Sequence, residues 1–163
     1  MDAVLLSIHV LASIVLVGGS AIATSLFPRY APVATSVTAA QGVAGAPADP
    51  LQDTQGERDR AVAVALHRIT RGYGMLGVVV PVAGITLALV QGRMGELWIT
   101  VSMVLTAVAG GLLALQIYPR QRDALAAPDD GTRLRTLSML AGIYNLLWAV
   151  VVVLMIVRPG AQA

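Results

Sequence analysis

Hydrophobic residues form four long blocks along the chain, and polar residues collect between them. The blocks run from about 3 to 27, 73 to 92, 97 to 118 and 136 to 157. Each is close to the roughly 20 apolar residues that a helix needs to cross a bilayer, and none alternates as a membrane β-strand does. The pattern predicts an all-α membrane protein, with residues 1–163 forming a single four-transmembrane-helix bundle.

The connection between the first two blocks has two parts of different character. Residues 31–56 are rich in Ala, Pro, Gly and Thr and lack hydrophobic periodicity, which predicts a flexible cytoplasmic loop. In the stretch GERDRAVAVALHRITRGYG, residues 56–74, we expect an extra amphipathic cytoplasmic helix that lies along the inner face and runs into the second crossing. Its apolar positions have helical spacing among arginines: Ala61, Val62, Ala65, Leu66 and Ile69.

Arginines separate the two sides of the predicted bundle. Nine of them lie in the segments after the first and third blocks, and only Arg93 and Arg158 lie on the other side. The positive-inside rule places loops 28–72 and 119–135 in the cytoplasm and both termini outside. We therefore expect a multi-pass protein of the cell inner (plasma) membrane.

Composition supports this class and excludes others. The chain is 56% hydrophobic and 12% charged, whereas soluble domains are about a quarter charged. A net charge of +2 without a basic, aromatic-interleaved patch gives no reason to expect a nucleic-acid partner. The absence of cysteine excludes disulfides and thiolate metal sites. All basic residues are arginine, and Ala, Gly and Val abound, which is typical of a GC-rich genome such as an actinobacterial one.

Small and polar residues recur at helical spacing inside the blocks. Lipid is as apolar as leucine, so helices in a bilayer associate through close packing and hydrogen bonds. We expect the stripes to face other helices, with Pro81 kinking the second helix and Asn145 making an interhelical hydrogen bond. The stripe residues, in chain order, are Ser13, Ser20, Thr24, Gly77, Pro81, Gly84, Gly110 and Asn145.

One ionisable residue, His9, lies on the same face of the first helix as Ser13, Ser20 and Thr24. An ionisable group at membrane depth is a functional candidate, and three roles stay open: polar packing, proton handling and ligation of haem b. His67 lies on the other side of the membrane, about 27 Å away along the helix axis, so one haem cannot take both histidines. The second axial ligand would be Met103, Met155 or a residue of another subunit.

Four segments together resemble a family of small four-helix bacterial membrane proteins: IHVLASIVLVGG, the FPR ending, the basic segment before a Gly/Pro-containing helix, and VVVVLMIVRPG. The family is similar to HemJ-type protoporphyrinogen oxidases and to the membrane domain of CopD-type copper-resistance proteins. The resemblance implies four crossings and a first-helix histidine that serves haem binding and activity, a position that His9 matches. The oxidases also use a lysine near the start of the third helix, where this chain reads ELWITVSM.

Three functional hypotheses follow. The first is an accessory or structural subunit that packs in the lipid bilayer against other membrane protein subunits, for instance those of a respiratory-chain complex. The second is a haem-dependent membrane oxidoreductase that uses His9. The third is handling of copper or another small solute, with ligands drawn from His9, Met75, Met103, Met139 and Met155. The sequence contains no phosphate-binding glycine loop and no HExxH motif.

Overall fold

The structure of the chain is a computed structural model, which describes residues 2–34 and 50–160. Throughout these ranges the regular elements are helices, and four continuous stretches are long and apolar enough to cross a membrane. This confirms the predicted fold class. The elements are α1 (Asp2–Ala12), η1 (Ser13–Val17), α2 (Gly18–Tyr30), α4 (Pro50–Leu76), α5 (Val79–Val90), α6 (Leu97–Leu112), η2 (Leu113–Ile117), α7 (Tyr118–Ala126) and α8 (Thr132–Val157).

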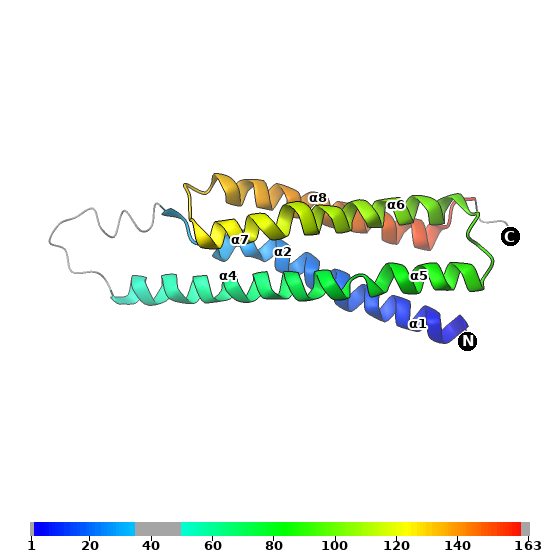
Figure 1. Cartoon of the computed structure of the whole chain (residues 1–163). Coiled ribbons are helices and arrows are strands. Elements are labelled where there is room, and N and C mark those ends of the chain that lie inside the picture. The colour runs from blue at the N-terminus through cyan, green and yellow to red at the C-terminus, as the bar shows by residue number, and fades with distance from the viewer. Residues whose placement is uncertain (1, 35–49, 161–163) are drawn as a thin grey trace.

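The chain forms two antiparallel helical hairpins that lie side by side along one long axis (Figure 1). Both described chain ends and the 91–96 turn lie at one end of the bundle. The 127–131 turn and the start of α4 lie at the other (Figure 1). The segments that carry nine of the arginines are thus together at one end, which we call the arginine-rich end. We call the opposite end the distal end.

Pro81 interrupts the second crossing, as the sequence predicts. A proline in a helix lacks an N–H, and its ring clashes with the carbonyl four residues earlier, here that of Gly77. The helix breaks at this carbonyl, between α4 and α5, and the Gly77 oxygen accepts a hydrogen bond from Val80 N at 3.1 Å instead.

The third crossing does not end at Tyr118, where the sequence predicted its end. A π-helical turn, η2, leads directly into α7, which carries Pro119 in its first turn and continues to Ala126. Proline is tolerated in a first turn because the N–H there has no intrahelical partner. The helix therefore extends about two turns beyond the predicted crossing.

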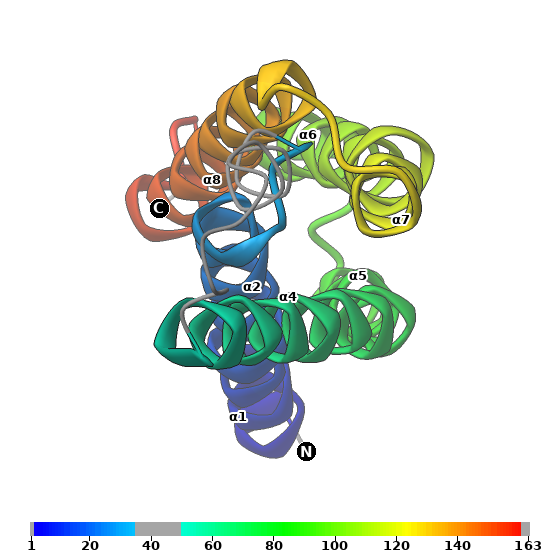
Figure 2. The same ribbon diagram turned by 90° about the vertical axis from the view of Figure 1, so that its left-hand side faces the viewer.

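The segment before the second crossing is part of one long helix. Residues 57–71 belong to α4, which runs along the bundle axis and packs against α2 and α7 (Figures 1 and 2). A separate amphipathic helix on the membrane face is therefore not confirmed. The flexible-loop prediction is wrong for residues 50–56, which are helical, and residues 35–49 lie outside the described ranges.

The buried core lies toward the arginine-rich end. There α2 packs against both α4 and α8, and η2 and α7 also pack against α8. The central side chains are Phe27, Ala63, Ile117 and Leu137, all at most 1% exposed. Toward the distal end the helices divide into two pairs, α1 with α5 and α6 with α8, which have little contact with each other (Figure 2).

Candidate functional site

His9 is fitted into the surface of α5. Its side chain is 7% exposed, and its Nδ1 lies 3.1 Å from the backbone oxygen of Val80. A carbonyl can only accept, so Nδ1 carries the proton and donates the hydrogen bond. Gly84 makes room for the ring, because a Cβ at this position would lie 2.9 Å from His9 Cε1. The small and polar stripes predicted for the first two crossings thus contact each other where the His9 ring of α1 packs against Gly84 of α5.

In the neutral imidazole this geometry leaves Nε2 with a lone pair. Metal-binding histidines commonly have this arrangement, in which one ring nitrogen donates to a carbonyl and the other binds the metal. By itself, the His9 side chain therefore has a nitrogen that could serve as an axial haem ligand. The same geometry also serves a polar packing residue, because the bond to Val80 satisfies its N–H.

The methionines expected to complete a haem or copper site lie elsewhere. Met103 is on α6 and Met155 on α8, helices that have little contact with α1. Met75 and Met139 are exposed on α4 and α8. The structure does not bring these four side chains together with His9, so none of them forms an axial pair with it within one chain. Among the described residues there is also no group of three His, Cys, Asp or Glu that could hold a metal ion.

Polar residues of α2 and α8 join these two helices. The Ser20 hydroxyl lies 2.8 Å from that of Tyr144, and both side chains are buried. Asn145 Nδ2 donates to Ser25 Oγ at 2.8 Å, which confirms the interhelical bond predicted for Asn145. Tyr144 was not predicted to take part, although its place beside Asn145 in an apolar helix was a signal.

The other two hydroxyls of the predicted stripe bond within their own helix. Thr24 is buried and donates to the Ala21 carbonyl, and half-buried Ser13 donates to the His9 carbonyl at 2.7 Å. A hydroxyl that bonds one turn back satisfies its polarity without a partner helix. The Ser13 hydroxyl is therefore bonded to the backbone of His9 on its own helix.

A second histidine cluster lies between α4 and α7. His67 Nδ1 lies 3.2 Å from Gln121 Oε1, and its ring stacks on Tyr118 with centroids 4.8 Å apart. Gln121 is fully buried, and its Nε2 has no partner among the described residues. The sequence did not predict this cluster, because a third helix that ends at Tyr118 leaves Gln121 in a loop.

A third polar cluster lies at the distal end. Glu96 accepts hydrogen bonds from Arg93, at 2.5 Å, and from the indole N–H of Trp98. Arg93 and Arg158 each lie 5.8 Å from the centre of the Trp98 ring, within cation–π range. The hydrogen bond from Arg93 lowers the pKa of Glu96 and raises that of Arg93. The Arg158–Trp98 contact joins the end of α8 to the residues that follow the 91–96 turn. The ion pair between Arg93 and Glu96 neutralises two of the charges at this end.

Two glycines of the predicted packing stripes differ in role from Gly84. Gly77 lies at the Pro81 break, where a Cβ would come within 2.8 Å of the Tyr73 carbonyl. Gly110 was predicted to face another helix of the bundle, and this prediction is wrong. Gly110 lies on the exposed side of α6, where an added Cβ would meet no atom within 4 Å. The inner side of α6 instead carries Ser102 and Ala109.

The chain was also compared with known proteins. No protein-family model, no curated protein and no solved structure matches it. Its function is therefore argued from the residues and their geometry.

Proposed function

We propose that this chain is an accessory subunit of a larger membrane complex, such as a respiratory-chain complex, and that it contributes packing surface rather than a reaction centre. The observation that carries the proposal is the exposed side of α6. Three exposed small residues follow one another there at spacings of three and four residues: Ala107 and Gly110 of α6 and Ala114 of the adjoining η2. Small residues at this spacing let a second transmembrane helix approach closely.

The internal polar groups support the same role. Ser20, Tyr144 and Asn145 bond across the α2–α8 contact, and His9 bonds across the α1–α5 contact. These bonds hold the helices together. The small exposed stripe, in contrast, has no function inside the isolated bundle.

Native electrophoresis after solubilisation in mild detergents tests the proposal. The wild-type chain, of 16.9 kDa, is expected to migrate in a complex much larger than its own mass. In Gly110→Ile the larger side chain would keep the partner helix away from the stripe, so the variant chain should dissociate from the complex. Val104→Ile, which adds bulk to another exposed position of α6, should not. Migration as a lone chain in every detergent would contradict the proposal.

We also propose that the arginine-rich end is cytoplasmic and that both termini are outside, since arginine bias sets orientation. At the distal end Glu96 neutralises Arg93, so the difference in positive charge between the two ends becomes larger. The chain has no cysteine, so single cysteines at Gly95 and Ala127 would be its only thiols. In intact cells an impermeant maleimide should label the first and not the second, and the reverse pattern would refute the orientation.

A haem-binding role is the second candidate, and the free Nε2 of His9 favours it. A bound haem would supply one-electron chemistry, and His9 would hold its iron from one side. Met103 and Met155 lie on helices that have little contact with α1, so neither would join His9 in holding it. Protein purified from haem-replete cells should then show a Soret band that His9→Ala abolishes. Protein that stays colourless after haemin is added would reject this candidate.

A further inference from the structure

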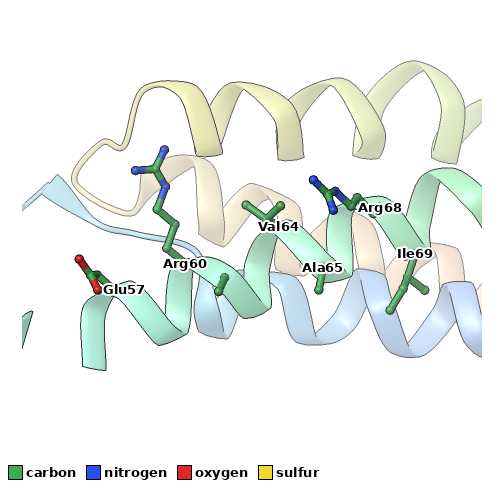
Figure 3. A pocket seen from close by; sticks show the side chains of 7 residues that line it. Glu57, Arg60, Val64, Ala65, Arg68 and Ile69 are labelled. Atoms are coloured by element: carbon green, nitrogen blue, oxygen red, sulfur yellow. The ribbon is translucent and has the colours of Figure 1, made fainter. Parts of the chain in front are cut away.

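A groove runs along the exposed side of α4 at the arginine-rich end (Figure 3). It is open and has a volume of about 620 Å³. Arg60, Val64 and Arg68 point to one edge, and Ala65 and Ile69 to the other (Figure 3). The lining residues recur every three or four positions, so they share one face of the helix: Glu57, Arg60, Ala61, Val64, Ala65, Arg68 and Ile69.

The bundle does not use this face. α4 packs against α2 and α7 through Ala63, Leu66 and Thr70, which are buried. The sequence pattern assigns Leu66 to the same apolar face as Ala61 and Ala65. In the structure they separate, because Leu66 turns inward and the two alanines stay exposed. α4 therefore has two apolar faces, and the outer one has no partner within the described residues.

The charges beside the groove call for an anionic occupant. Arg60 and Arg68 make no salt bridge or hydrogen bond in the part of the chain that the structure describes. They lie about 12 Å apart along the helix axis, because each residue adds 1.5 Å. Glu57 gives the N-terminal end of the groove the opposite charge. An occupant with carboxylates at a matching spacing would pair with both arginines.

The position of the groove favours a protein over a lipid headgroup. Arg60 precedes Tyr73, the predicted start of the crossing, by 13 residues or about 20 Å. The headgroup layer of each leaflet is only about 5 to 8 Å thick. Most of the groove would therefore project beyond the lipid.

A second copy of the chain is a poor fit. Copies in one membrane are related by an axis along the membrane normal, which brings the same residues of both copies together. Arg60 would then face Arg60, and Arg68 would face Arg68, and like charges in contact oppose association. A different chain is therefore needed.

We propose that this groove binds an acidic amphipathic helix on the cytoplasmic side of a neighbouring subunit. The inference rests on the accessory role proposed above and specifies the chemistry of the partner. Ala61 and Ala65 let the partner backbone come close, and Val64 and Ile69 cover its apolar side chains. Two carboxylates seven or eight residues apart meet Arg60 and Arg68.

Photocrosslinking in cells tests this proposal. A photoreactive amino acid at Ala61 or Ala65 should form an adduct whose sequenced peptide has acidic residues at this helical spacing. Gln55, which is exposed on α4 outside the groove, is the control position. Adducts with lipid, with a second copy of this chain, or with a peptide lacking such acidic residues would overturn the proposal.

Charge reversal supplies the second measurement. Arg60→Glu with Arg68→Glu should lower the adduct yield about fivefold or more, since two ion pairs with the partner are lost and the reversed charges repel its carboxylates. Arg58→Glu with Arg122→Glu makes the same change of net charge outside the groove and should leave the yield unchanged. Reversal of the two partner carboxylates should restore the adduct, and equal yields from both double variants would refute the proposal.

Native electrophoresis of the same samples separates the two proposals. A chain that still migrates in a complex but forms no adduct at Ala61 or Ala65 refutes the groove and leaves the accessory role standing. A chain that migrates alone refutes both.

Discussion

Replacement of Gly84 by alanine tests the contact between α1 and α5. The new Cβ would lie 2.9 Å from His9 Cε1, which is closer than carbon atoms pack, and 3.4 Å from Nδ1. The imidazole must move away from α5, and its hydrogen bond to the Val80 carbonyl, now 3.1 Å, must lengthen or break. The change therefore acts on packing and on hydrogen bonding together.

The expected loss follows from these two effects. Overpacking of a filled contact costs about 1–3 kcal/mol, and a hydrogen bond between membrane helices contributes about 0.6 kcal/mol. Alanine returns up to about 1 kcal/mol through its better helix propensity. The free energy of unfolding of Gly84→Ala should fall by about 1–2 kcal/mol. Gly110→Ala, which meets no neighbouring atom, should keep or gain stability.

Unfolding in mixed micelles, followed by far-ultraviolet circular dichroism, measures both variants. A double-mutant cycle with His9→Ala identifies the cause, because removal of the imidazole gives the new methyl group space. The two substitutions should then couple by about 1 kcal/mol or more. Additive effects, or equal stability of Gly84→Ala and Gly110→Ala, would refute the reasoning.

Three further results are expected. Gly19→Ala should destabilise the protein by about 1 kcal/mol, because its Cβ would lie 2.8 Å from the Tyr73 ring, while neighbouring Gly18→Ala, in open space, should not. Tyr144→Phe removes a buried interhelical hydrogen bond and should cost about 0.6 kcal/mol in the same assay. The folded-state pKa of Glu96 is lowered, so its contribution to stability is present at neutral pH. This contribution should be lost as the pH falls below the ordinary pKa of glutamate and through the lowered pKa of Glu96. In thermal melts, Glu96→Gln should abolish this dependence of stability on acid pH.

Hydropathy predicts the crossings because every backbone polar group in lipid must be bonded within a helix or a closed barrel. It does not predict where a helix ends in water. Pro119 looked like a terminator, yet α7 continues past it, because the π turn η2 places the proline in a first turn. Residues 50–56 looked like a loop from composition alone, yet they begin α4.

The faces of the helices were predicted less well than their lengths. Each residue turns a helix by about 100°, so a stripe is identified only if the direction of the neighbouring helix is known. His9 and Gly84 were each assigned to a packing stripe, but their direct contact needs the relative rotation of α1 and α5. Gly110 is small like Gly84 and faces outward, so residue size alone does not distinguish an internal contact from an external one.

The division of the bundle into two pairs at the distal end has a mechanical consequence. The bundle resembles a pair of tongs whose joint is the core around Phe27 and Leu137 and whose arms are α1 with α5 and α6 with α8. The interhelical bonds of Tyr144 and Asn145 lie near the joint, and the 91–96 turn links the arms at their tips. Changes in bilayer thickness or lateral pressure would therefore act on the arms, one of which carries His9, more than on the packed joint.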